Sequence, residues 1–212
     1  MTKKWPLYIE SILLFILLPV SFLWAYPFYL KVLVAVAAFV YVLIVLFRVE
    51  KPKRTSISRT EWISWVKRTT IVFGCICVAS IFYVYTFAPA QLFYVPIHKT
   101  KLYVLILGVY TVLSVWPQEI VYRTFFITRY RLLFSNNTQR IFINALVFAC
   151  AHLFLRNLLV LIITFVGGLL FAYTYIKKPS TLLVSIEHAL YGNWLFTVGL
   201  GNMLAFPGIE AG

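Results

Sequence analysis

The chain has 212 residues, of which 62% are hydrophobic and only 12% are charged. An ordinary soluble domain is about 45–50% apolar and about 25% charged, so this composition excludes a soluble globular protein. At about 20 residues per spanning helix, the length accommodates six to eight helices. We therefore predict an all-α fold, a polytopic membrane helical bundle that forms a single integral membrane domain over residues 1–212.

Taken in chain order, the apolar runs predict about seven spanning helices. The runs are Leu7–Trp24, Phe28–Phe47, Thr70–Ala88, Leu102–Phe126, Ile141–Leu155, Leu158–Ile176 and Thr181–Met203. Prolines lie at the ends of these runs or between them at residues 27, 52, 89, 96 and 179, as expected for helix breakers. The segments between the runs are short except for residues 48–68.

The basic residues predict the orientation of the chain in the membrane. Residues 48–68 contain seven Lys and Arg together with Trp62 and Trp65, which predicts a basic cytoplasmic loop with a short interfacial helix rather than a nucleic-acid site. With the N-terminus inside, 15 of the 19 basic residues face the cytoplasm, as the positive-inside rule requires. We expect a multi-pass protein with a cytoplasmic N-terminus in a bacterial inner (plasma) membrane, and no nucleic-acid partner.

Polar side chains recur inside three of the apolar runs. Ionisable groups are costly at membrane depth, so their default interpretation is a functional site that faces the bundle interior. The polar side chains are Gln118, Glu119 and Arg123 in the run 102–126, Asn144 and His152 in the run 141–155, and Glu187, His188 and Asn193 in the run 181–203. Glu119 and Arg123 stand four residues apart and share one helix face, which allows an ion pair.

The depths of these side chains predict that they converge. Glu119, His152 and His188 each lie ten to twelve residues from a basic anchor on the inner side, which is about 15–18 Å along a helix. In a hydrocarbon slab of about 30 Å, all three are near the midplane. Glu119 and His152 are expected opposite each other in a helical hairpin. One carboxylate and two imidazoles at one depth can deprotonate a water and stabilise an oxyanion.

The order of the motifs resembles a known family of membrane proteases. Three motifs carry this resemblance: Gln118-Glu119-xxx-Arg123, then Phe148-xxx-His152, then His188 followed by Asn193. They are similar to the motifs EExxxR, FxxxH and HxxxN or HxxxD of the CPBP family (CAAX proteases and bacteriocin-processing enzymes), which includes the type II CAAX prenyl endopeptidases. The resemblance covers the motif-bearing core, residues 102–203. It implies an intramembrane endopeptidase in which Glu119 and His152 activate water.

The same resemblance implies roles for the remaining site residues. His188 and Asn193 would stabilise the oxyanion, Arg123 would orient Glu119, and the substrate would be a membrane-associated peptide or protein in the lipid bilayer. Two positions depart from the family pattern, because Gln118 replaces the first glutamate and Gly192 stands four residues after His188, where an asparagine is expected. Asn193 follows one residue later, about 140° round a regular helix from His188.

Several alternatives remain open at this stage. Glu119 could serve only as a structural partner of Arg123, and Glu187 could replace it as the catalytic carboxylate. A zinc site is a chemical competitor, but no HExxH spacing is present, so we expect a metal-independent enzyme without a cofactor. A catalytically inactive scaffold of the same fold is the alternative function, and a transporter is the third. The sequence does not indicate the oligomeric state.

Overall fold

The computed structural model describes residues 4–52 and 56–204, and it folds them into helices and short connections without a strand. The helical runs are Trp5–Ser21, Phe28–Glu50, Arg59–Phe87, Thr100–Arg129, Asn137–Leu155, Leu158–Lys177 and Thr181–Val198. Of these, the five from Phe28–Glu50 to Leu158–Lys177 are long and apolar enough to cross a membrane, while Trp5–Ser21 is shorter. The predicted helical membrane bundle is confirmed.

Many large apolar side chains on these helices are exposed. Phe28 is 79% exposed, Leu113 70% and Leu158 73%, values that would be unfavourable in water. A helix surface of this kind is expected where the surroundings are hydrocarbon and the backbone polar groups are satisfied within the helix. The protein is therefore an integral membrane protein.

The third helix begins earlier than the sequence pattern predicts. We expected a short interfacial helix before a span at Thr70–Ala88, but one continuous helix, α4, runs from Arg59 to Phe87. A capping box starts it, because the Ser58 side chain accepts from the Glu61 N–H and the Glu61 carboxylate accepts from the Ser58 N–H. No helix breaker separates Arg59 from Thr70, so the basic segment continues into the span. Lys53 and Arg54 of the predicted loop, like Lys3, lie outside the described residues.

The Thr100–Arg129 helix contains two π-helical segments. In chain order it consists of α6 (Thr100–Val109), η4 (Tyr110–Val115), α7 (Trp116–Glu119), η5 (Ile120–Phe125) and α8 (Phe126–Arg129). Pro117 lies between the two π segments, and proline inside a helix removes a backbone hydrogen bond and displaces the preceding turn. The helix is thus locally distorted on both sides of Pro117, and π segments of this kind often occur at functional positions.

The described residues pack into two compact units. Within the described residues, the first unit lies in the ranges Met1–Arg54 and Pro117–Thr181, and the second in Thr55–Trp116 and Leu182–Gly212. The first contains α1 (Trp5–Ile12), η1 (Leu13–Leu17), α2 (Leu18–Ser21), α3 (Phe28–Val45), η2 (Leu46–Glu50), α7, η5, α8, α9 (Asn137–Cys150) and α10 (Leu158–Lys177). The second contains α4, α5 (Tyr94–His98), α6, η4 and α11 (Thr181–Val198) from Leu182 onward.

In the first unit, an ion cluster joins three helical runs. Arg129 at the end of α8 binds Glu10 of α1 at 2.8 Å and Glu50 of η2 at 3.1 Å. The Tyr130 hydroxyl also donates to Glu10. Burial and this carboxylate raise the pKa of the Tyr130 phenol above its ordinary value, which keeps the phenol a donor. The cluster fixes α1 and the end of η2 against the helix that carries Glu119.

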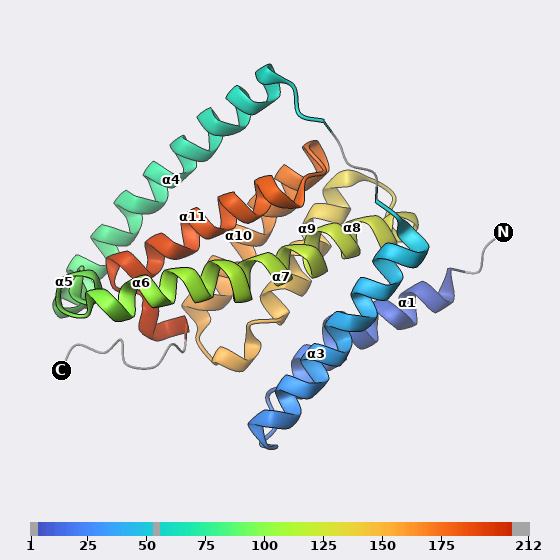
Figure 1. The fold of residues 1–212 in the computed structure, drawn as a ribbon, viewed down its shortest axis with the longest axis horizontal. Helices are drawn as coiled ribbons and strands as arrows, with labels where there is room; N and C mark the ends of the chain where they lie inside the picture. The colour runs from blue at the N-terminus through green and yellow to red at the C-terminus, as the bar shows by residue number, and fades with distance from the viewer. Residues whose placement is uncertain (1–3, 53–55, 205–212) are drawn as a thin grey trace. The chain divides into compact units, whose positions relative to one another are not determined.

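In the second unit, α11 packs against α4 on one face and against α6 and η4 on another (Figure 1). In the contacts between α4 and α11, the residue numbers increase along both helices, from Trp65–Glu187 to Ser80–Trp194. The two helices therefore run parallel. The contacts to α6 and η4 run the other way, from Tyr110–His188 to Tyr103–Thr197, so this pair is antiparallel. Every polar side chain predicted on α11 therefore faces a neighbouring helix.

Candidate functional site

The first unit holds a fully buried ion pair. Glu119 in α7 and Arg123 in η5 are both 0% exposed, and the Arg123 Nε lies 3.4 Å from the Glu119 Oε2. The guanidinium carbon of Arg123 lies 4.3 Å from the centre of the Phe148 ring and 5.5 Å from that of Phe171. Ion pairing and cation–π contact both lower the cost of a charge at membrane depth. The predicted pairing of Glu119 with Arg123 is present.

Helix α9 packs against this segment in an antiparallel register. The Asn144 Nδ2 donates to the Tyr122 carbonyl at 2.6 Å, and Phe148, one turn later, lies against Arg123. One further turn along α9 leads to His152, and one turn back along η5 leads to Glu119. The register therefore directs these two side chains toward the same end of the helix pair. Asn144 is itself 0% exposed.

His152 follows the end of α9 in a turn. Its Nδ1 lies 2.8 Å from the Phe148 carbonyl oxygen. A carbonyl oxygen only accepts hydrogen bonds, so this contact requires the Nδ1–H tautomer and places the lone pair of the ring on Nε2. The Phe148 ring also contacts the imidazole, with centroids 4.9 Å apart. In its neutral form, an imidazole held in this way can accept a proton at Nε2.

The second unit holds another buried carboxylate, Glu187, which we considered as an alternative catalytic group. An Arg68 nitrogen donates to both of its oxygens, at 2.9 and 2.8 Å. The Trp65 indole N–H and the Tyr191 hydroxyl donate to it as well, at 3.4 and 3.3 Å. Four contacts from α4 and α11 surround a side chain that is 0% exposed. Glu187 therefore fastens α11 to α4.

His188, the next residue, faces the opposite neighbour. Its Nε2 lies 3.2 Å from the hydroxyl of Tyr110, the first residue of the π segment η4. The two rings meet edge to face with centroids 6.1 Å apart, and both residues are less than 10% exposed. One residue after Tyr110, Thr111 accepts a hydrogen bond from the Asn193 Nδ2 at 3.0 Å. The pair His188 and Asn193 thus binds the pair Tyr110 and Thr111.

Two of these partners are not predicted by the sequence motifs. Arg68 appears in the sequence only as one of many basic residues near the inner surface, and it stands 119 residues before Glu187. Tyr110 is one of 14 tyrosines and belongs to no motif. Tyr110 lies in an apolar run at the start of the π segment η4. Hydrophobic periodicity does not indicate where a π segment begins, so the sequence does not single out Tyr110 as a site residue.

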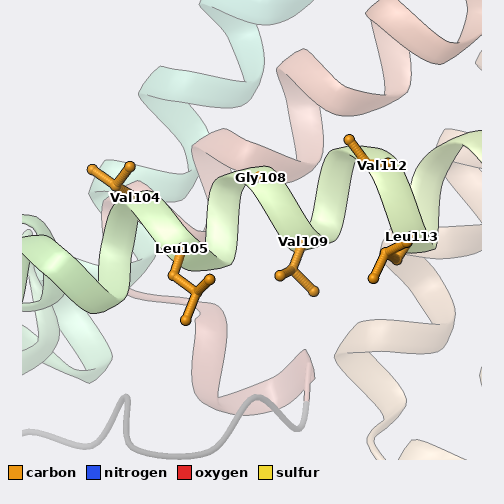
Figure 2. Close-up of a pocket in the computed structure, with 6 residues that line it drawn as sticks. All are labelled: Val104, Leu105, Gly108, Val109, Val112 and Leu113. Atoms are coloured by element: carbon orange, nitrogen blue, oxygen red, sulfur yellow. The ribbon is translucent and has the colours of Figure 1, made fainter.

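The described part of the chain contains no group of three or more His, Cys, Asp or Glu arranged to hold a metal ion. An open apolar recess of about 430 Å³ lies along α6 and η4, and Figure 2 shows the side chains that line it. Its lining is Val104, Leu105, Gly108, Val109, Val112 and Leu113. Ile106 and Tyr110 of the same helix are buried on the other side, so the recess lies on the surface exposed to lipid and not at the polar side chains.

The fold and these side chains define a class: a helical membrane protein with acid–base groups and their counter-charges buried in its spans. Residues 100–194, the segment that carries all three motifs, match the family model described as type II CAAX prenyl endopeptidase Rce1-like. The resemblance to the CPBP family is thereby confirmed over this segment. Comparisons with curated proteins and with solved structures found no match to the chain.

Proposed function

We propose that the protein is an intramembrane endopeptidase of the CAAX-protease type, which cleaves a membrane-associated peptide or protein. The observation that carries the proposal is the buried Glu119–Arg123 pair, against which α9 packs through Phe148, one turn before His152. A carboxylate and an imidazole are the side-chain groups that can act as general bases toward an attacking water. The match of residues 100–194 to a family of prenyl endopeptidases supports the same reaction.

In the proposed mechanism, Glu119 and His152 accept a proton from water while its oxygen attacks the carbonyl carbon of the scissile peptide bond. Arg123 holds the Glu119 carboxylate in place and counters its charge. His188, with Asn193 as its sequence-assigned partner, stabilises the oxyanion that forms. When the C–N bond breaks, the proton taken from water passes to the departing amine, so the groups return to their starting state.

The remaining parts of the proposal follow from composition and charge. We propose that the reaction needs no metal, since the motif spacing is that of a glutamate-type hydrolase and not HExxH. The enzyme would lie in a bacterial inner membrane with its N-terminus in the cytoplasm, because 15 of 19 basic residues are then inside. Its partners are the bilayer and the substrate, with no nucleic acid.

The proposal is tested with the full chain in proteoliposomes. The probes are a fluorogenic peptide that ends in a farnesylated CAAX sequence and the same peptide without the lipid. We expect cleavage of at least one probe, a loss of about 10²-fold or more in Glu119→Gln and in His152→Ala, and no effect of a chelator. Thermal unfolding in detergent checks that each variant is folded. A wild type that cleaves neither probe contradicts the proposal.

Two further variants locate the carboxylate. Loss of cleavage in Glu187→Gln with retention in Glu119→Gln would move the base to α11. The variant Gln118→Glu restores the first glutamate of the family motif. If the wild type is inert and this variant cleaves the probe, the scaffold function is correct. The observation that favours a scaffold is the pair of departures at Gln118 and Gly192.

A further inference from the structure

Three residues share the face of α11 that meets η4. His188, Gly192 and Phe196 follow one another at intervals of four, and Tyr110 lies across all three. Its hydroxyl is 3.2 Å from the His188 Nε2, and its ring packs edge to face on Phe196 with centroids 4.9 Å apart. Tyr110 and Phe196 are 9% and 1% exposed. The phenol is therefore held at His188 by contacts along two turns of α11.

Gly192 is what allows the phenol to reach this position. A Cβ built at Gly192 would overlap the hydroxyl oxygen and the ring carbons of Tyr110. Gly192 lies inside α11 and has no unusual backbone conformation, so the lack of a side chain, and not conformational freedom, is what the position requires. The space one turn after His188, where a residue side chain would stand, is filled by the Tyr110 hydroxyl instead.

The carboxamide one residue later is turned toward a different partner. The Asn193 Nδ2 donates to the Thr111 hydroxyl at 3.0 Å, while the Thr197 hydroxyl donates to the Asn193 backbone carbonyl. Asn193 thus fixes the register between α11 and η4 at the position next to Tyr110. The Tyr110 phenol, and not this carboxamide, is in hydrogen-bonding contact with the His188 Nε2.

We propose that the Tyr110 hydroxyl, together with the His188 ring, forms the pair of groups that binds the oxyanion, in the place that an asparagine four residues after His188 would take. A phenol is a neutral donor that acts in the same way as a side-chain amide toward a developing oxyanion. If His188 donates from Nε2 to the phenol oxygen, the phenol proton is directed onward and the two hydrogen bonds strengthen each other. Asn193 is then a positioning residue.

This inference rests on the proposed protease function. The test below distinguishes a failure of the role of Tyr110 from a failure of the protease function itself. In the proteoliposome assay with the farnesylated probe, we expect Tyr110→Phe to lower kcat by about 10²-fold and to leave KM within about twofold, because only an interaction made in the transition state is lost. The matched control is Tyr103→Phe. It removes a phenol of the same helix that binds α11 through Thr197 at 2.9 Å, and it should keep wild-type kcat.

A side-chain exchange gives the second arm of the test. Tyr110→Ala removes the ring that blocks Gly192, and Gly192→Asn then has room for a carboxamide one turn after His188. We expect the double variant to recover at least tenfold in kcat over Tyr110→Ala. Wild-type kcat in Tyr110→Phe, or a folded double variant no more active than Tyr110→Ala, overturns the role of Tyr110 and leaves the protease function standing. An inert wild type overturns the protease function itself.

Discussion

Arg123 is 0% exposed and contacts one carboxylate and two aromatic rings. A planar guanidinium can stack its face on an aromatic ring while the N–H groups at its edge pair with a carboxylate. An ammonium group cannot make both contacts in this way. The Phe148 and Phe171 faces therefore select arginine rather than positive charge alone.

Arg123→Lys should show this selection. The lysine keeps the charge but loses the stacked contact, so we expect a loss of about 1–2 kcal/mol in stability and cleavage at least tenfold slower because Glu119 is held less firmly. Thermal unfolding in detergent and kcat with the farnesylated probe measure the two effects. Arg140→Lys, in the first turn of α9, is the control that should change neither. Wild-type stability in Arg123→Lys would show that charge alone is needed.

The Arg68–Glu187 pair makes a separate prediction. Arg68→Gln leaves a 0% exposed carboxylate with its main counter-charge removed, which should cost about 3 kcal/mol, the lower end for breaking a buried pair. Glu187→Gln should also destabilise, and the double variant should be less destabilised than the sum of the two. A double-mutant cycle on unfolding free energies measures the coupling. Additive losses would mean that the two side chains do not interact.

Among individual residues, the sequence predicts interacting pairs that are close along the chain and misses pairs that are far apart along it. Glu119 and Arg123 are four residues apart, so helix geometry alone brings them together. Arg68 and Glu187 come together only through the packing of α4 on α11. The contact of Tyr110 with His188 depends on the π segment and on the missing side chain of Gly192, neither of which follows from hydrophobic periodicity.

At the scale of helices, small residues allow the closest contact. Helix α10 packs against α9, and a Cβ built at Gly168 would lie 2.9 Å from the Ala145 Cα and 3.1 Å from its Cβ. Small residues at such a contact let two membrane helices approach each other closely. The α9–α10 contact also holds Phe148 and Phe171 against the guanidinium of Arg123, so its spacing affects the candidate site.

Gly168→Ala is therefore expected to push the two helices apart and to cost about 1–3 kcal/mol. The matched control is Gly74→Ala in α4, where an added Cβ meets no atom within 4 Å. That change should be neutral or stabilise by up to about 1 kcal/mol through helix propensity. Thermal unfolding of both variants in detergent measures the difference. Equal stabilities would show that the α9–α10 contact has room for a methyl group.

The positions of the helices are largely predictable, while their local geometry is not. Except at the start of α4, hydropathy locates the helical runs within a few residues, because burial in lipid requires about 20 apolar residues. It misplaces the start of α4 because the capping box at Ser58 and Glu61 begins the helix inside the basic segment. The S-x-x-E pattern was a usable signal there. The π segments have no comparable signal.

At the scale of the whole molecule, charge and helix direction bear on one property, the orientation in the membrane. Fifteen of 19 basic residues lie on one side if the spans alternate, and this asymmetry normally faces the cytoplasm. Helix α4 has 29 residues, about 44 Å at 1.5 Å per residue. This exceeds the hydrocarbon thickness of about 30 Å, so the basic first turns of α4 reach the headgroup region. With the N-terminus inside, we expect the Lys and Arg of these turns to lie near anionic lipid at the inner surface.

This orientation is tested by labelling single cysteines in intact cells. Cys75, Cys77 and Cys150 are unpaired thiols and are first replaced by alanine. With a membrane-impermeant maleimide, Ser56→Cys and Asn137→Cys should react only after the membrane is opened, because both lie beside the basic inner segments. Thr100→Cys, at the start of α6 and beside Lys99 and Lys101, should react in intact cells.

Strong labelling at Ser56→Cys or Asn137→Cys from outside, with protection at Thr100→Cys, would reverse the orientation. The helix directions within each unit would stand, because they rest on contacts and not on charge.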